Sequence, residues 1–333
     1  MLGSFQCSGL DGLSLLVKRR LSVAKRRLSD LTFSRRVSEC STSLPDEFPY
    51  ELESVLGAGS FGVVHQARNI DSGKACVVKV IDLGRAPQAF ALGHEVAVQG
   101  GLEHPNISKI FDTFRDNSSL YLVMELCRGD DLSVAIDAIG DNAENDATFA
   151  IRQILSAASY LYARKVCHRD LKPDNCLLKR HGVPLVENTI KVIDFGLATH
   201  MVPGKLCMRT RCGSPCYMAP EVVRGKAYDE KCDIWSCGVI LYNLLSAEMP
   251  FEGSSLKELS GSVVSEPLKF KGRRWDNVTE SMKSLVTDMC DKNPRRRPHA
   301  HQCLLHPCLR LPEDEEAVPG DASCDSMGRL GGA

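Results

Sequence analysis

The spacing of apolar residues changes along the chain, and each change predicts a different structural element. Between residues 50 and 81, residues typical of strands surround a glycine triplet, and the run ACVVKVI (75–81) is almost wholly apolar. This pattern predicts a strand, a glycine turn and two further strands. The next segment, HEVAVQGGLEHPNI, predicts a helix that carries Glu95, and the run SMKSLVTDMC (281–290) predicts a late helix.

The first 44 residues have a different pattern, which is both basic and amphipathic. Residues 13–38 carry eight Lys or Arg residues and one acid, Asp30, and the pentapeptide KRRLS occurs twice within them, seven residues apart. At a helical spacing of 100° per residue, the apolar side chains of this segment share a narrow arc: Leu13, Val17, Leu21, Ala24, Leu28 and Leu31.

Several functions are compatible with this leader. A basic amphipathic helix over residues 13–31 is typical of a calmodulin target or of a helix that lies on an anionic membrane. A Ser/Arg-rich, acid-poor start is also typical of a transit peptide, which would place the protein in an organelle. A solvated, disordered tail is the simplest alternative, and residues 310–333, acidic and then rich in Gly and Ser, have the composition of a second such tail.

The composition of the whole chain is that of a soluble globular protein. It has 333 residues, of which 43% are hydrophobic and 25% are charged, and its net charge is −1. We expect no secretory signal, because the start MLGSFQCSGL lacks a charged region and a sustained apolar run, and no membrane span, because no apolar run is long enough. The fifteen cysteines include no CxxC pair, so we expect reduced thiols in a cytoplasmic monomer, with the nucleus as an alternative location and no nucleic-acid partner.

The glycine triplet and the lysine that follows it point to a phosphate-containing ligand. Gly57, Gly59 and Gly62 form GxGxxG, where the missing side chains let backbone N–H groups approach phosphate oxygens. Lys79 lies within the apolar run that follows, where an ammonium group is costly unless it is paired. Glu95 is the available partner, although a snorkelling lysine and a solvated glutamate would fit these residues equally well.

Four later segments carry the decisive pattern. They are VCHRDLKPDNCLL (166–178), KVIDFGLATH (191–200), CYMAPE (216–221) and DIWSCGVILY (233–242). In this order and spacing, after GxGxxG, they resemble the signature set of the eukaryotic protein kinases. The resemblance covers residues 50–309 and implies transfer of the γ-phosphate of ATP to a protein.

The resemblance implies a role for each polar residue of these segments. Asp170 would orient the substrate hydroxyl and accept its proton, and Lys172 would steady the γ-phosphate. Asn175 and Asp194 would bind Mg²⁺, or Mn²⁺, because carboxylate and amide oxygens suit a hard cation. With ATP these ions are the implied cofactors. Glu221 would form a structural ion pair with Arg297.

The resemblance also implies an adenine pocket and a phosphate-binding roof. Met124 would lie at the gate of the pocket, Glu125 and Cys127 on the hinge, and Asp131 near the ribose or a basic substrate side chain. Lys79, held by Glu95, would bind the α- and β-phosphates. The full set of expected ATP-binding residues is Leu56, Gly57, Ala58, Gly59, Ser60, Phe61, Gly62, Val64, Val77, Lys79, Glu95, Met124, Glu125, Cys127 and Asp131.

Finer features favour the serine/threonine class. Lys172 in LKPDN is typical of that class, and CGSPCYMAPE resembles the calmodulin- and calcium-dependent kinases, with Ser214 in place of their usual threonine. The chain contains no DxDxDG loop, so an intrinsic EF-hand is not supported. The segment between Asn175 and Asp194 is longer than that family implies and predicts a wide hairpin. A catalytically silent scaffold with the kinase fold is the alternative function.

Two kinds of regulatory site are expected. Thr210 lies where related kinases carry an activating phosphate, which would pair with Arg169 and Lys191. In the leader, the pattern R-R-x-S predicts that the kinase phosphorylates Ser22, Ser29 and Ser38 itself, or that the leader occupies its own substrate groove.

The same pattern bears on the choice of substrate. An arginine before the target serine pairs with acids near the active site, for which Asp131 and Asp174 are candidates. A third acid, common in strongly basophilic kinases, is replaced by Asn243. We therefore expect protein substrates with basic residues near Ser or Thr, and a moderate basic preference.

The expected fold class is α+β, in a bilobal arrangement. A small antiparallel β-rich lobe with one main helix would span residues 47–127, and a larger helical lobe residues 128–309. The leader, residues 1–46, and the tail, residues 310–333, would lie outside both lobes.

Overall fold

The computed structural model describes residues 45, 48–59, 62–83, 96, 98–139, 143–202 and 204–310. The predictions for the leader, including Ser22, Ser29 and Ser38, and for the tail beyond residue 310 lie outside the described residues.

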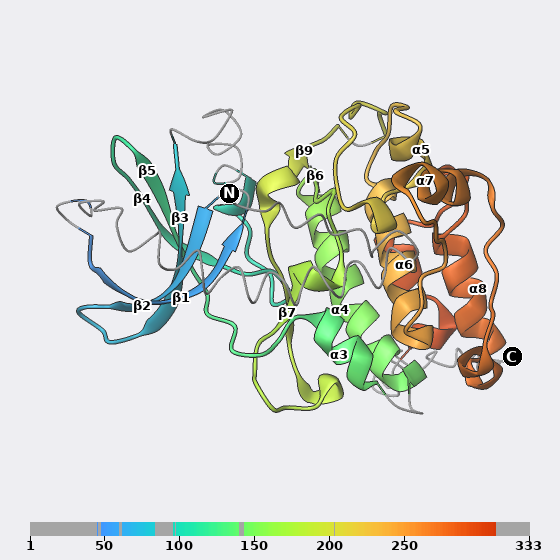
Figure 1. Ribbon diagram of the computed structural model, residues 1–333, viewed down its shortest axis with the longest axis horizontal. Helices are drawn as coiled ribbons and strands as arrows, with labels where there is room; N and C mark the ends of the chain where they lie inside the picture. Colours follow the sequence, from blue (N-terminus) through green and yellow to red (C-terminus); the bar gives the residue numbers. More distant parts are fainter. Residues whose placement is uncertain are drawn as a thin grey trace, which may run out of the picture.

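A five-stranded antiparallel sheet forms the first lobe, at the left of Figure 1. Its strands follow the order β1-β2-β3-β5-β4, and the strand–glycine turn–strand–strand prediction is confirmed. The strands are β1 (Tyr50–Gly59), β2 (Gly62–Asn69), β3 (Ala75–Asp82), β4 (Ile110–Arg115) and β5 (Ser119–Met124).

Alternation along the strands divides the apolar side chains of this sheet between two faces. One cluster gathers Tyr121 and Val78 with the rings of Phe48 and Tyr50, and Phe48 and Tyr121 have ring centroids 5.2 Å apart. A smaller cluster contains Ile81, Leu120 and Leu122. The register of β3 sets Lys79 opposite Val64 on one side and Leu122 on the other.

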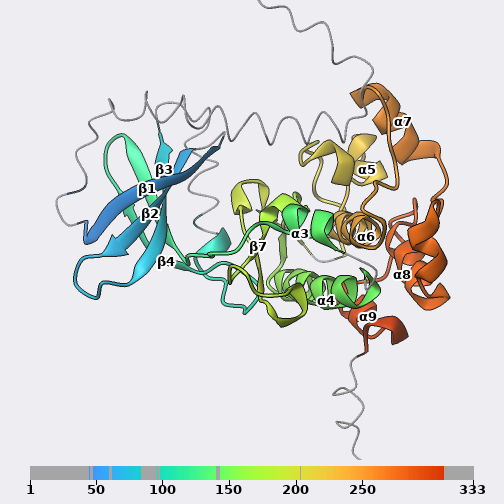
Figure 2. The same cartoon turned by 60° about the horizontal axis from the view of Figure 1, so that its bottom comes forward.

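Helices build the second lobe, at the right of Figure 1, around one central helix. All sixteen residues of α6 are buried, and its sequence is apolar around most of its circumference, which is typical of a helix in a core. Helix α6 packs against α4 and α8, and α4 also packs against α9 (Figure 2). The helices are α3 (Leu132–Ala138), α4 (Ala143–Ala163), α5 (Pro220–Val223), α6 (Lys231–Ser246), α7 (Leu256–Ser265), α8 (Glu280–Met289) and α9 (Ala300–Leu304).

Short elements fill the region between the sheet and the helices. The predicted wide hairpin is confirmed: β7 pairs with β8, and a loop with one 3₁₀ turn joins them. The predicted late helix is also confirmed, as α8. The described residues together form an α+β fold of two lobes. These short strands are β6 (Val166–Cys167), β7 (Cys176–Leu178), β8 (Ile190–Val192) and β9 (Thr199–His200).

Among the helices that the structure describes, none combines the length and the apolar character needed to cross a bilayer.

Candidate active site

Asp170 lies between β6 and β7, and its carboxylate is held by three donors. Oδ1 accepts a hydrogen bond from the backbone N–H of Ser214 at 2.7 Å. Oδ2 accepts one from Nδ2 of Asn175 at 3.2 Å and lies 3.2 Å from Nζ of Lys172. The Asp170 side chain is 11% exposed, so these contacts fix its orientation while it still reaches solvent.

The segment around Ser214 docks onto this carboxylate through both main chain and side chain. Nζ of Lys172 donates to the Ser214 hydroxyl at 2.9 Å. Gly213 has a φ of +105°, and a Cβ built there would lie 2.6 Å from the carbonyl oxygen of Arg169. Only glycine fits this close approach, so the glycine lets the segment touch the loop that carries Asp170.

Asp233, at the start of α6, holds the same loop from beneath. Its Oδ2 accepts from the N–H of His168 at 2.7 Å, and its Oδ1 accepts from the N–H of Arg169 at 2.8 Å. Arg169 has a φ of +68°, a conformation that is costly for a residue with a side chain. The two hydrogen bonds to Asp233 offset that cost and fix the backbone just before Asp170.

The β7–β8 hairpin brings the two expected magnesium ligands together. Asn175 directly precedes β7, Asp194 lies two residues after β8, and the N–H of Ile193 donates to the carbonyl of Asn175 at 2.9 Å. Asn175 uses its Nδ2 on Asp170, at the backbone carbonyl and at Oδ2.

Lys79 reaches Asp194 from the other lobe. Its Nζ lies 3.4 Å from Oδ1 of Asp194. Burial raises the pKa of Asp194, but the ammonium of Lys79, His168 and the N–H of Gly196 together outweigh burial, so the pKa lies below its ordinary value. Glu95, the expected partner of Lys79, lies outside the described residues.

The glycine strand forms the roof of this site. A Cβ built at Gly62 would lie 2.1 Å from the carbonyl oxygen of Val80, so the turn cannot hold a side chain there. Around Gly57, by contrast, no heavy atom of the described residues other than its two chain neighbours lies within 4 Å of such a Cβ. Ala58 and Gly59 pair with Val63 and Gly62 in the β1–β2 ladder.

The remaining roof residues differ in burial. Leu56 is 50% exposed, Val77 is buried at 9% exposure, and Val64 is partly buried. Ser60 and Phe61 lie outside the described residues.

Met124 ends β5, and the chain then crosses to the second lobe. Glu125 bonds back to the first lobe through its N–H, which donates to the carbonyl of Lys109 at 3.0 Å. Its carboxylate pairs with Nζ of Lys191, at 2.7 Å, and with Nζ of Lys179, at 3.0 Å. Burial raises the pKa of Glu125, but the two lysines outweigh burial and hold it below its ordinary value. No local feature of the sequence indicates this pair of contacts.

This arrangement corrects one expectation. Lys191 was expected to meet a phosphate on Thr210 together with Arg169. Instead it is buried in β8, facing Glu125, and its side chain is 8% exposed. Thr210 is exposed on a different segment, so Lys191 is not a partner for its phosphate.

With this geometry in view, a comparison with known families decides the identity. The protein kinase domain matches residues 50–309. The chain belongs to the protein kinase family. Calcium-dependent protein kinase 3 of Plasmodium berghei (strain Anka) is 36% identical over 286 residues, which cover 86% of this chain and 51% of that protein.

Two further relatives come from other organisms. A probable myosin light chain kinase of Dictyostelium discoideum is 34% identical over 89% of this chain and 76% of its own length. The human serine/threonine-protein kinase DCLK2 is 34% identical over 89% of this chain and 38% of its own. The relatives are thus calcium-dependent and other serine/threonine kinases. The chain spans about half the length of calcium-dependent protein kinase 3 of Plasmodium berghei and of Plasmodium yoelii yoelii, 51% and 52%.

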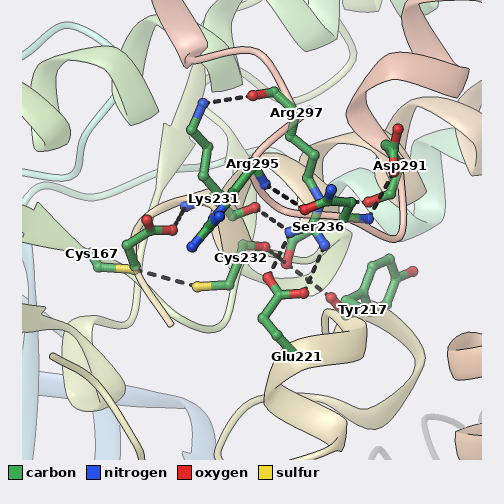
Figure 3. A network of polar contacts seen from close by, with 11 residues as sticks. Cys167, Tyr217, Glu221, Lys231, Cys232, Ser236, Asp291, Arg295 and Arg297 are labelled. Atoms are coloured by element: carbon green, nitrogen blue, oxygen red, sulfur yellow. Dashed lines mark hydrogen bonds and ion pairs between the residues drawn. The ribbon is translucent and has the colours of Figure 1, made fainter. Parts of the chain in front are cut away.

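This protein kinase domain also contains the predicted ion pair, next to the activation segment, residues 194–221. Arg297 is 1% exposed and donates from Nη1 and Nη2 to the two carboxylate oxygens of Glu221, both at 2.7 Å. The carbonyl oxygen of Arg297 accepts from Nζ of Lys231 at 2.6 Å (Figure 3). The pair therefore ties the end of the activation segment to the first turn of α6.

Asp131 has a structural role at the kinase hinge. It is the N-cap of α3, and its Oδ1 accepts from the N–H of Ser133 at 3.0 Å and of Val134 at 3.3 Å. Cys127, on the hinge, is partly buried, and burial raises the pKa of its thiol to about 11. This thiol is therefore protonated at neutral pH.

Two buried cysteines meet next to the loop that carries Asp170. The sulfur atoms of Cys167 and Cys232 lie 3.5 Å apart (Figure 3), and Sγ of Cys167 lies 3.3 Å from Oδ2 of Asp233. In the described part of the chain, only this trio could offer three metal-ligand atoms at close range. Asp233 already accepts two backbone hydrogen bonds, and burial raises the pKa of both thiols, so the cluster fits a packed core better than a metal centre.

Proposed function

We propose that this chain is a protein serine/threonine kinase that transfers the γ-phosphate of ATP to a Ser or Thr hydroxyl. One observation carries the proposal: Asp170, Lys172 and Asn175 contact one another directly, and Asp194 lies at the end of the hairpin that starts at Asn175. Asp170, Lys172 and Asn175 lie in one loop, and the β7–β8 hairpin brings Asp194 from a separate segment to the same place.

The reaction needs a proton acceptor and charge neutralisation. The substrate hydroxyl oxygen would bond to the γ-phosphorus while the bond from that phosphorus to the β–γ bridging oxygen breaks, and the hydroxyl proton passes to Asp170. Hydrogen bonds from Ser214 N–H and from Nδ2 of Asn175 orient the Asp170 carboxylate. A loose transition state depends mainly on such orientation of the reacting groups. Lys172 lies close enough to Asp170 to meet the transferred group.

The residues present fit ATP and its divalent ions. When bound, magnesium neutralises the charge of the phosphates. Asn175 and Asp194 supply hard oxygen ligands. Because Nδ2 of Asn175 donates to Asp170, its side-chain oxygen, Oδ1, remains for a cation. Gly57 has no side chain, which leaves room for phosphate oxygens, and Lys79 would compensate their charge.

Substitution of Asp170 by Asn tests the proposal. The variant keeps the shape of the side chain but cannot accept a proton, so phosphate transfer to a basic Ser peptide should fall by at least about 10²-fold. ATP binding, measured by calorimetry, should stay within about twofold of the wild type. A wild-type chain that binds ATP and transfers no phosphate would contradict the proposal and favour a silent scaffold.

For substrates, we propose a moderate preference for basic residues before the phosphoacceptor. Asp174, next to Asn175, and Asp131 are the acids that would pair with substrate arginines. Asn243 offers no carboxylate to a substrate arginine. It is buried, and its Nδ2 donates to the carbonyl of Glu248 at 3.1 Å. A peptide array with arginine at each upstream position would measure the preference, which should weaken in Asp174→Asn.

The leader is proposed as a substrate of this same kinase. Mass spectrometry after incubation with ATP should find phosphate on Ser22, Ser29 or Ser38. A peptide of residues 10–38, added to calmodulin or to anionic vesicles, distinguishes autophosphorylation from partner binding. An unmodified leader whose deletion leaves activity unchanged would contradict both roles.

A further inference from the structure

Three exposed basic side chains lie on and beside the activation segment. They are Arg209 and Arg211, on the segment, and Lys226, in the turn between α5 and α6 (Figure 1). We call these three residues the basic surface. Glu221, the acid between them in the sequence, is buried and pairs with Arg297. Among the described residues, no carboxylate forms an ion pair with any of the three, so their charges can serve an acidic ligand.

Two contacts fix the position of the basic surface. Met208 and Tyr228 exchange two backbone hydrogen bonds, at 3.2 Å and 2.9 Å. The stem of Arg211 lies against the turn between α5 and α6, because a Cβ built at Gly225 would lie 3.5 Å from Cδ of Arg211. The activation segment and the turn that carries Lys226 therefore lie side by side.

The basic surface begins a few residues from the expected proton acceptor. The N–H of Ser214 donates to Oδ1 of Asp170 at 2.7 Å. Arg211 is three residues before Ser214, a separation that chain geometry limits to about 11 Å. The long side chain of Arg211 can extend over part of that distance. A substrate residue next to a serine at Asp170 therefore lies within reach of the guanidinium.

Asp170 separates the basic surface from the acids proposed to bind substrate arginines. Its Oδ1 accepts from Ser214, on the segment that carries Arg211, whereas its Oδ2 accepts from Asn175, the neighbour of Asp174. The two oxygens of one carboxylate thus face surroundings of opposite charge. An arginine that precedes the substrate serine and pairs with Asp174 directs the residues after the serine toward the basic surface.

The sequence of the leader supplies an independent observation. Two of its three R-R-x-S sites, KRRLSD (25–30) and RRVSE (35–39), carry an acid directly after the serine. The third, KRRLSV (18–23), carries Val23 there. Two candidate sites thus combine arginines before the serine with an acid after it, which is the order of charge that the two sides of Asp170 would accommodate.

We propose that the basic surface binds an acidic side chain directly after the phosphoacceptor serine, so that the preferred substrate is R-R-x-S followed by Asp or Glu. This inference rests on the proposed kinase function and adds a second determinant to its basic preference. Guanidinium groups pair with carboxylates in directional, charge-assisted hydrogen bonds. Because the basic surface is exposed, solvent and salt screen these pairs, and the preference is modest.

Steady-state kinetics of the full-length protein on three peptides tests the inference. KRRLSDL copies residues 25–31, and KRRLSNL and KRRLSKL change only the residue after the serine. The kcat/KM for KRRLSDL should be about fivefold higher than for KRRLSNL, the order expected of exposed ion pairs. The value for KRRLSKL should be the lowest. Equal kcat/KM values for the three peptides would overturn the inference.

Charge reversal at Arg211 tests whether the basic surface causes this preference. Arg211→Glu should invert the order, so that KRRLSKL becomes the best peptide and KRRLSDL the worst, and Arg211→Gln should reduce the difference between them without inverting it. Arg274→Glu is the matched control and should keep the wild-type order. Arg274 is equally exposed and lies in the 3₁₀ turn Arg273–Asn277, which packs on the second half of α6. A wild-type order in Arg211→Glu would show that other groups select the acid, and the inference would be wrong.

Peptide binding keeps the test independent of catalysis. Fluorescein-labelled KRRLADL and KRRLANL have no phosphoacceptor, and the Kd of KRRLADL should be about threefold lower at about 50 mM salt, with the difference lost at about 0.5 M. If the wild type binds ATP but phosphorylates no peptide, the proposed kinase function fails, while a remaining difference in Kd supports the basic surface. Equal Kd values at low salt, in an active kinase or an inactive one, contradict the basic surface itself.

Discussion

The two lobes meet where Lys79 contacts Asp194 and form two walls of the candidate site, and these walls are built in different ways. On the helical side, Asp170 is fixed by Ser214 and Lys172, and the loop before it is held by Asp233 at the start of the wholly buried α6. On the sheet side, the glycine strand is exposed: Val55 and Leu56 are 40% and 50% exposed. The groups that would react are thus held by buried hydrogen bonds, while the roof is a surface open to solvent.

This difference has a physical reason. Groups that stabilise a transition state act best when the fold has oriented them beforehand, so that no reorganisation is needed during the reaction. A roof that must admit and release a nucleotide has to expose apolar surface when it is empty. Changes on the helical wall should therefore affect stability and kcat together, and changes on the roof should affect ATP binding with little loss of stability.

The largest effect on stability is expected at the Glu221–Arg297 pair. Glu221→Ala leaves the guanidinium of Arg297, at 1% exposure, without its carboxylate, and should lower the free energy of unfolding by about 4 kcal/mol. Urea denaturation followed by far-UV circular dichroism measures this. Glu280→Ala is the control, because Glu280 is exposed and pairs only with the nearby Lys283 within the described residues; it should cost about 0.5 kcal/mol or less.

The next largest effect is expected at Asp233. In Asp233→Asn, one carboxylate oxygen becomes a donor facing the N–H of His168 or Arg169, which should cost about 3 kcal/mol of stability. Because Arg169 would lose the bond that offsets its positive φ, kcat should fall about 100-fold, with a smaller change in the KM for ATP. Asp276→Asn, at an exposed position, is the control. A destabilised variant with normal kcat would show that the loop does not depend on this clamp.

Much of this architecture is predictable from local sequence. The strands around the glycine triplet, helix α8 and the wide β7–β8 hairpin are confirmed, because spacing and turn residues act over a few positions. The short motifs also identified Asp170, Asn175 and Asp194, which the fold gathers at one end of that hairpin.

The supporting contacts were not predictable, because they join residues far apart in the chain. Asp233 and His168 are 65 positions apart, and nothing near either residue indicates the other. Lys191 was assigned to the wrong partner for the same reason: its side chain faces Glu125, 66 positions away, and no spacing rule gives the direction in which a residue of a short buried strand points.

A smaller effect is expected at the Glu125–Lys191 pair, which lies where the two walls meet. Lys191→Met should lower stability by about 2 kcal/mol at pH 7, because the carboxylate of Glu125 keeps only Lys179. Lys179→Met, which removes the more exposed lysine, should cost less than half as much.

The pH dependence of stability shows whether Lys191 contributes through its charge. The pKa of Glu125 is lower in the folded protein than its ordinary value of 4.5, so its pairing stabilises the fold above pH 4.5 and is lost as the pH falls through the folded pKa. The stability gap between wild type and Lys191→Met should therefore narrow below pH 4.5. A gap that is constant from pH 7 to pH 3.5 would show that Lys191 contributes packing and not charge.

The smallest effect on stability is expected on the roof, at Leu56. Because its side chain is 50% exposed, Leu56→Ala should change the free energy of unfolding by about 0.5 kcal/mol or less. The KM for ATP should nevertheless rise about threefold, since burial of part of this side chain against the nucleotide contributes to binding. Ile70→Ala is the control, because Ile70 is 64% exposed in the turn between β2 and β3, away from Gly57, and should change neither quantity. A loss of stability above about 1 kcal/mol in Leu56→Ala would mean that the roof is packed like the opposite wall, and the contrast between the two walls would not hold.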